Sequence, residues 1–176
     1  HDYWREMDRF LKEEIGLKAP VSGTQTGFSP PHVQADLDIV DSHVYWKHPK
    51  QKWRQENVAM VNDPYGGCPG TAAARRVAGK PYIISEYNHP YPAFYGAEGQ
   101  PMIRAYAAFQ DWDGVFQYSY NNRRNAEPLF TEYYFSCCAR TDVLAHMPAA
   151  AAMFLRGDVA TCRSSCVVPF AEDEFA

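Results

Sequence analysis

Glu86, His43 and Tyr45 are the side chains whose types and spacing best suit catalysis. Glu86 ends the apolar run Pro81-Tyr-Ile-Ile-Ser and therefore stands at the carboxyl end of a predicted strand. His43 and Tyr45 end the preceding predicted strand and, being two residues apart, point to the same side of a sheet. A carboxylate held by a rigid strand can act as a nucleophile or a base. A tyrosine hydroxyl that donates to it would keep it ionised and oriented.

Each of these three residues also has a purely structural interpretation. Glu86 can pair with a basic side chain from a loop, His43 can be a half-buried histidine, and Tyr45 can pack against its neighbours. The strand end favours a functional Glu86, because parallel β/α folds build their active sites there. For His43 and Tyr45 the sequence leaves both interpretations open.

Aromatic and amide side chains gather at the same predicted loop ends and suit a sugar ligand. Aromatic rings can stack on the C–H faces of sugars, but they pack loops equally well. Amides can bind hydroxyl groups or cap loops. The candidates for substrate binding, beside His43 and Tyr45, are Trp46, Asn88, Gln25, Gln117 and Tyr118.

Strands alternate with helices along the chain, which is typical of a parallel sheet with helices outside it. We expect strands over 19–25, 37–45, 80–86 and 113–120, and helices over 2–15, 31–36, 72–78 (capped by Thr71), from Pro101, over 128–138, and over 141–157 with a break near Pro148. The strands become polar towards their carboxyl ends, where β/α folds place their chemistry. We expect one domain over 1–157, with 158–176 a tail or the start of a following domain.

Composition excludes several classes of protein. With 17 Lys and Arg against 21 Asp and Glu, the chain lacks the excess positive charge of a nucleic-acid-binding surface. It has no apolar run of about 18 residues, so we expect no membrane span. The spacing of the five cysteines favours free thiols or one local disulfide over a metal site. Localisation is left undetermined between a bacterial cytoplasm and secretion.

The motifs, taken in order, resemble the C-terminal half of a retaining (β/α)8-barrel glycoside hydrolase, in the clan of family-five cellulases and β-galactosidases. Asp41-Ser-His-Val-Tyr-Trp46 matches strand six, Pro81-Tyr-Ile-Ile-Ser-Glu-Tyr-Asn88 matches strand seven, and Asp111-Trp-Asp-Gly-Val-Phe116 enters strand eight. The segment 147–158 resembles the last barrel helix. The resemblance covers roughly residues 1–159 and implies a half TIM barrel of about four parallel β/α units, strands five to eight.

The resemblance also implies a function. It makes Glu86 the nucleophile and places His43 and Tyr45 beside it, while Tyr118 stands where the family often has a tryptophan. The acid/base glutamate of the family lies after strand four, before the segment matched here, so we expect little or no activity from this chain alone. No metal or organic cofactor is implied.

The expected ligand is an oligosaccharide or polysaccharide. The expected partner is a second copy of the chain or a missing N-terminal half-barrel. The alternative is a non-catalytic carbohydrate-binding or self-associating half-barrel scaffold, and the sequence leaves open whether the chain is an enzyme.

Overall fold

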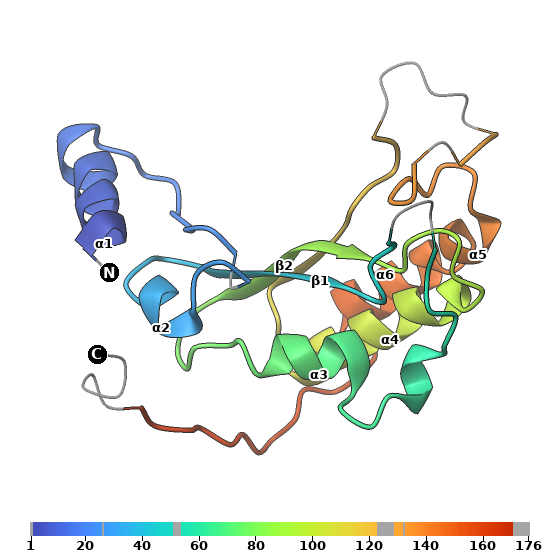
Figure 1. Cartoon of the computed structure of the whole chain (residues 1–176). Coiled ribbons are helices and arrows are strands. Elements are labelled where there is room, and N and C mark those ends of the chain that lie inside the picture. The colour runs from blue at the N-terminus through green and yellow to red at the C-terminus, as the bar shows by residue number, and fades with distance from the viewer. Residues whose placement is uncertain (1, 26, 51–53, 123–128, 132, 171–176) are drawn as a thin grey trace.

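The computed structural model describes residues 2–25, 27–50, 54–122, 129–131 and 133–170, and within them the fold is α/β (Figure 1). A three-stranded parallel sheet holds β1 (Val40–Tyr45), β2 (Tyr82–Asn88) and β3 (Gly114–Gln117) in the order β1-β2-β3. The predicted parallel sheet is confirmed for these three strands. The expected strand over 19–25 is reduced, in its described part, to one parallel bridge between Ser22 and Ile39.

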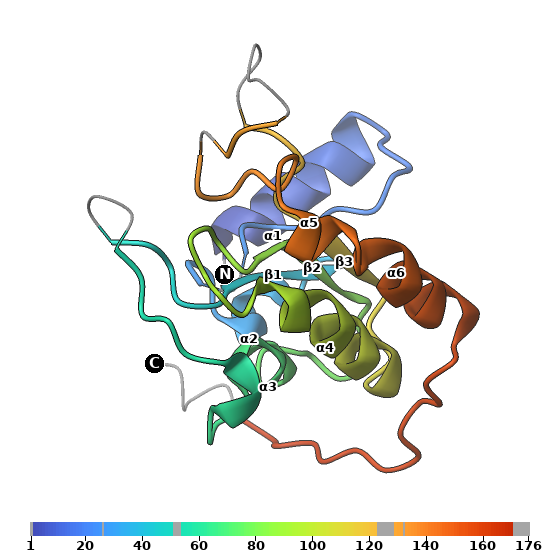
Figure 2. The same ribbon diagram turned by 90° about the vertical axis from the view of Figure 1, so that its right-hand side faces the viewer.

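Helices link consecutive strands and cover one face of the sheet. Helix α3 (Gly67–Ala73) joins β1 to β2, and α4 (Gly96–Phe109) joins β2 to β3. Helices α5 (Thr141–Leu144) and α6 (Met147–Arg156) follow β3. Figure 2 shows α3, α4 and α6 side by side on one side of the sheet. The core between these layers includes Val40, Val44, Tyr82, Ile84, Tyr87, Ile103 and Ala107.

The amino-terminal helix lies beside the segment that leads into β1 (Figure 1). The predicted helix over 2–15 is confirmed as α1 (Asp2–Arg9) continued by a π-helical turn (Phe10–Glu14). Arg5 forms an ion pair with Asp36 at 2.7 Å, and Lys12 contacts Asp38 at the same distance. The predicted turns over 31–36 are present as α2 (Pro31–Gln34).

Two predicted helix starts and one predicted helix are wrong. Helix α3 begins at Gly67, not after Thr71, because Asp63 Oδ2 accepts the Gly67 N–H at 2.7 Å and starts the helix earlier. Helix α4 begins at Gly96, so Pro101 lies inside it. The described part of 128–138 contains no helix. The predicted break near Pro148 is confirmed by the gap between α5 and α6, and Gly157, with φ +67°, ends α6 as expected.

Side chains occupy the outer edge of β1, where a further strand would pair. The amide of Gln34 is fully buried: its Oε1 accepts the Asp41 N–H at 2.9 Å and its Nε2 lies 3.3 Å from the Asp41 carbonyl oxygen. Arg75 Nη1 donates to the His43 carbonyl at 3.0 Å. These bonds satisfy backbone groups that would otherwise be left unpaired at the edge of the sheet.

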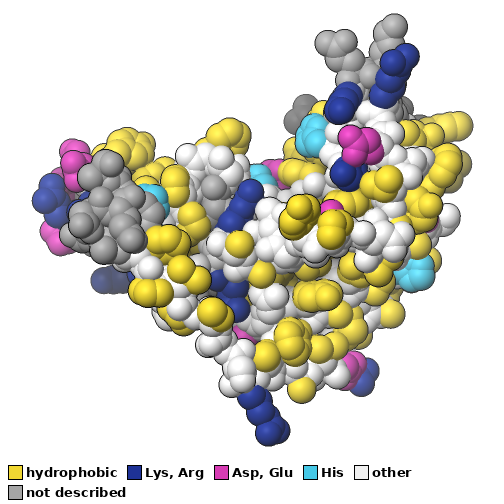
Figure 3. All heavy atoms as spheres, turned by 60° about the horizontal axis from the view of Figure 1, so that its bottom comes forward, with side chains coloured by type: hydrophobic (Ala, Val, Ile, Leu, Met, Phe, Trp, Pro, Cys, Tyr) yellow, Lys and Arg dark blue, Asp and Glu magenta, His cyan; other side chains and the backbone are white. Residues whose placement is uncertain are grey.

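The outer surface of the helical layer is partly apolar. Tyr106 and Phe109 of α4 and Leu155 of α6 are exposed. Figure 3, which brings the bottom of Figure 1 towards the viewer, shows many hydrophobic side chains among a few basic ones. Within the described residues, no helix has the length and hydropathy needed to cross a membrane. All five cysteines are free thiols.

Candidate active site

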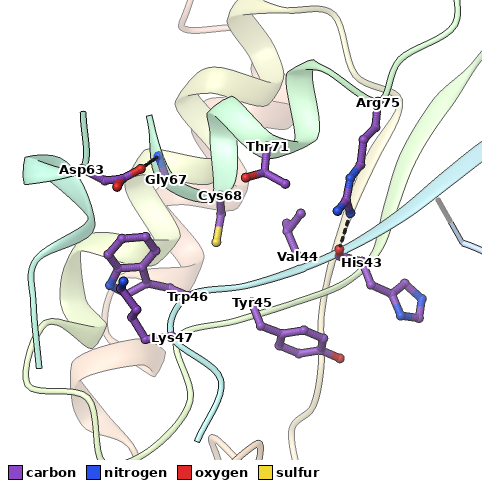
Figure 4. A pocket seen from close by; sticks show the side chains of 10 residues that line it. All are labelled: His43, Val44, Tyr45, Trp46, Lys47, Asp63, Gly67, Cys68, Thr71 and Arg75. Carbon is purple, nitrogen blue, oxygen red and sulfur yellow. Dashed lines mark hydrogen bonds between the residues drawn. The ribbon is translucent and has the colours of Figure 1, made fainter. Parts of the chain in front are cut away.

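An irregularity in β2 brings Glu86 opposite His43. Val40 pairs with Tyr82 and Ser42 with Ile84, but the next pair is His43 with Glu86, so Ser85 is an extra residue in β2. Such a bulge turns over the side chains that follow it. Glu86 therefore lies on the face opposite the helices, and Figure 4 shows His43 and Tyr45 pointing away from α3. The predicted neighbourhood of these three residues is confirmed.

Glu86 is held by two side chains of β1. The Tyr45 hydroxyl donates to Glu86 Oε2, and His43 Nδ1 lies 3.3 Å from the same oxygen. Burial raises the pKa of Tyr45 well above its ordinary value, and the hydrogen bond and charge of Glu86 raise it further. Tyr45 therefore stays protonated as a donor. The side chains of His43 and Glu86 keep 27% and 28% of their surface exposed, which leaves room for a ligand.

Ser85 and Asp41 extend this contact on the other side of His43. Ser85 Oγ lies 2.9 Å from His43 Nε2 and donates to Asp41 Oδ2 at 2.7 Å. The Ser85 N–H donates to Asp41 Oδ1 at 3.1 Å, and Asp41 is only 8% exposed. A continuous chain of polar contacts thus runs from Asp41 through Ser85, His43 and Glu86 to Tyr45, in which His43 and Glu86 are at ion-pair distance and the other contacts are hydrogen bonds. Alternation along β1 puts Asp41 on the face of His43, and alternation after the core residue Ile84 puts Ser85 on the same face, but the sequence analysis singled out neither residue for the site.

The order Ser85, His43, Glu86 also matches the hydroxyl, imidazole and carboxylate of a serine hydrolase. In such an enzyme the hydroxyl donates its proton to the imidazole. Here the hydroxyl donates to Asp41, so His43 Nε2 faces oxygen lone pairs. The Ser85 hydroxyl is therefore not oriented as a nucleophile that gives its proton to His43.

Asn88 and Tyr118 lie near the site but differ in what they can offer a ligand. The Tyr118 ring stands edge-on to Tyr45 with centroids 6.4 Å apart and is partly exposed. Asn88 is buried, and its Nδ2 donates to the backbone carbonyls of Tyr118 at 2.5 Å and Phe135 at 2.7 Å. The Asn88 amide nitrogen thus anchors two loop segments.

The three other predicted binding residues are not brought to Glu86. Trp46 is buried on the α3 side of β1, and its Nε1 donates to the Val58 carbonyl at 2.9 Å. Gln117 accepts from Gln100 Nε2 at 2.6 Å, which places it towards α4. Gln25 accepts the Gly27 N–H within its own turn.

An aromatic cluster, which we call the aromatic wall, flanks Tyr45 and was missed by the sequence analysis. The Phe135 ring stacks on Tyr45 with centroids 4.5 Å apart. Tyr134 and His48 meet Phe135 edge-on at 4.6 and 5.2 Å, and Tyr133 lies 4.3 Å from Tyr134. The run Tyr-Tyr-Phe was a compositional clue, but the expected helix over 128–138 hid its place in the site.

A separate cavity of about 330 Å³ opens on the other side of β1, beside α3 (Figure 4). It is lined by His43, Val44, Tyr45, Trp46, Lys47, Asp63, Gly67, Cys68, Thr71 and Arg75. Burial raises the pKa of Cys68 to about 12, so its thiol is protonated. Glu86 does not line this cavity, which is therefore not the candidate active site.

Comparison with known proteins adds no assignment. No family model, curated protein or solved structure matches the chain. Among the described residues, no group of three or more His, Cys, Asp or Glu side chains is placed to hold a metal ion.

Proposed function

We propose that the chain is the nucleophile-bearing part of a retaining β-glycosidase, with Glu86 as the nucleophile. The observation that carries this proposal is the contact of Glu86 with both Tyr45 and His43 at the carboxyl ends of neighbouring parallel strands. The hydrogen bond from the Tyr45 hydroxyl and the nearby His43 imidazole fix the orientation of the Glu86 carboxylate. Its partial exposure lets it reach a bound sugar.

In this reaction a Glu86 oxygen attacks the anomeric carbon, and the bond from that carbon to the leaving oxygen breaks. The leaving oxygen takes the electron pair and a proton from a second carboxyl group. Water then attacks the anomeric carbon, with the second carboxylate taking its proton, and the electron pair of the sugar–enzyme bond returns to Glu86. Tyr45 and His43 stabilise the carboxylate that reappears.

The second carboxyl group has to lie about 5–5.5 Å from Glu86. Asp41, on the same face, is committed to Ser85, so we propose that the acid/base comes from outside the sheet described here. The source would be a second copy of the chain or an N-terminal half-barrel. The three parallel strands with helices on one face are compatible with part of a (β/α)8 barrel, and we propose that the chain corresponds to four of its β/α units, strands five to eight.

A second candidate function is carbohydrate binding without turnover. The aromatic wall beside Glu86 favours it, because such rings offer stacking faces to a sugar. The proposed ligand in both cases is an oligosaccharide or polysaccharide.

Covalent labelling tests the first proposal. Dinitrophenyl 2-deoxy-2-fluoro-β-glycosides have a leaving group that needs no proton, so attack by Glu86 requires no acid partner. Intact-mass measurement and peptide mapping should find one sugar on Glu86. Glu86→Gln should abolish the adduct, whereas Glu56→Gln, at an exposed position, should retain it.

The outcomes separate the two functions. Labelling at Glu86 supports the glycosidase. Saturable binding of oligosaccharides without labelling supports the binding protein and refutes the nucleophile. Neither labelling nor binding refutes both.

A further inference from the structure

We propose that Ser85 and Asp41 are positioning residues that hold His43 with a proton on each ring nitrogen, so that its imidazolium forms an ion pair with Glu86. This role deepens the proposed function of Glu86 and rests on it. The geometry that points to it is the chain of contacts from Asp41 to Tyr45.

The first step concerns the proton of the Ser85 hydroxyl. An ionised carboxylate only accepts hydrogen bonds. Asp41 receives both the N–H and the O–H of Ser85, at 3.1 and 2.7 Å. The single hydroxyl proton is thereby used, and Ser85 Oγ can only accept from His43 Nε2 at 2.9 Å. His43 Nε2 therefore carries a proton.

The second step concerns the other nitrogen of the same ring. Nδ1 lies 3.3 Å from Glu86 Oε2, and a bare nitrogen there would set its lone pair against a carboxylate oxygen. The same oxygen already accepts the hydrogen bond of the Tyr45 hydroxyl. The contact is attractive when Nδ1 also carries a proton. Two acceptors on opposite sides of the ring thus require two donors.

The groups around the ring agree with a positive charge. Glu86 faces the His43 ring from β2. Tyr45 of β1 contacts Glu86, and Asp41 of β1 reaches the ring through Ser85. Arg75, which follows α3, donates to Ser42 Oγ at 3.1 Å and to the His43 carbonyl at 3.0 Å, from the side of the strand opposite the His43 ring (Figure 4). Two carboxylates therefore flank one imidazolium.

The consequence for the reaction lies in the second step. Glu86 is uncharged while it is bonded to the sugar, and its negative charge returns when that bond breaks. A cation fixed 3.3 Å away stabilises this returning charge without having to reorient. Ser85 and Asp41 act by keeping that cation in place, since they do not touch Glu86 themselves.

Nitrogen-15 NMR of the imidazole rings tests the protonation directly, in the whole chain and without substrate. The His43→Gln variant identifies the signals of His43 among those of the six histidines. At neutral pH both His43 nitrogens should give the shift of a protonated nitrogen. In Ser85→Ala, Nε2 should change to the shift of a bare nitrogen, because its acceptor is gone. Ser85→Thr should restore the original pattern.

Asp41→Asn is a second variant that keeps the proposal testable if Ser85→Ala does not fold. The new amide can donate to Ser85 Oγ, which turns the hydroxyl proton towards His43, so Nε2 should again become bare. Ser22→Ala, at an exposed serine, should leave the spectrum unchanged. A bare His43 nitrogen in the unaltered chain, or a spectrum insensitive to both variants, would overturn the proposal.

A kinetic measurement links the geometry to the reaction. Azide, an anion that attacks the anomeric carbon without giving up a proton, should release the sugar from labelled Glu86 about tenfold or more slowly in Ser85→Ala, the loss expected for one charge-assisted hydrogen bond. Ser85→Thr should recover the rate, and an unchanged rate in Ser85→Ala would refute the catalytic consequence. If the NMR result holds but Glu86 is never labelled, the positioning stands and the glycosidase proposal fails.

Discussion

Lowering the pH is predicted to destabilise the chain through His89, the residue that follows β2. Its ring is 1% exposed, with Nδ1 2.8 Å from the Tyr87 hydroxyl and Nε2 3.4 Å from Glu98 Oε1. Burial lowers the pKa of His89 to about 4, against the opposing effect of the Glu98 carboxylate. Burial also raises the pKa of Tyr87 well above its ordinary value, so its hydroxyl stays protonated and donates to the neutral imidazole.

The size of the effect follows from the two states of His89. In the unfolded chain the imidazole takes up its proton near the ordinary pKa of 6.5, whereas in the folded chain it does so only near 4. The stabilisation is therefore complete above pH 6.5 and is lost as the pH falls towards 4. At about 1.36 kcal/mol per pH unit, the difference is about 3 kcal/mol. Domains of this kind unfold with only about 5–15 kcal/mol, so the loss is readily measured.

Urea unfolding, followed by tryptophan fluorescence from about pH 7 to about pH 4.5, measures this loss. The His89→Gln variant should be less stable at neutral pH, because it disturbs the contacts with Tyr87 and Glu98. Its stability should vary less with pH than that of the unaltered chain. His146→Gln, at an exposed histidine, should keep the original pH dependence. An equally steep acid loss in His89→Gln would refute this assignment.

Three further predictions concern single side chains. Gln34→Leu keeps the side-chain volume but removes both hydrogen bonds to the Asp41 backbone. The free energy of unfolding, measured by guanidinium titration, should fall by about 1–3 kcal/mol. A fall below about 0.5 kcal/mol would contradict the role of Gln34. Asn88→Ala leaves two backbone carbonyls without their donor and should lower the free energy of unfolding by a similar amount. Weaker sugar binding at unchanged stability would instead indicate that Asn88 contacts the ligand directly. Tyr45→Phe removes the hydroxyl that donates to Glu86, so azide should release the labelled sugar about tenfold to a hundredfold more slowly, and equal release rates would argue against that contact.

The parts of the fold that depend on local pattern were predictable. The 3.6-residue spacing of apolar side chains defined α1, and apolar runs with polar ends defined β1, β2 and β3. Because consecutive strands of a β/α sheet are commonly neighbours, the pairing of β1 with β2 was also within reach, whereas the face on which Glu86 lies depends on the extra residue Ser85. Strict alternation after Tyr45 likewise places Trp46 on the opposite side of the sheet.

The parts that depend on distant contacts were not predictable. The start of α4 is set by packing: a Cβ at Gly99 would lie 2.5 Å from His89 Nδ1 and 2.6 Å from the Tyr87 hydroxyl. This first turn packs closely against β2, and Glu98 accepts backbone N–H groups from the loop around Met60, so the helix continues through Pro101. The extra residue Ser85 in β2 has no sequence pattern either, yet it supplies half of the contacts of His43.

Because Gln34 and Arg75 cover the outer edge of β1, a further strand could join the sheet more easily at its other edge. Backbone groups of Asp41 and His43 are already occupied, so an incoming strand would have to displace a fully buried amide and a guanidinium there. In the order β1-β2-β3, the other edge of the sheet is formed by β3. Two copies that met through β3 would form a six-stranded pair with both outer edges closed by side chains. Such an assembly stops at two, whereas a sheet open at both edges could add copies without limit.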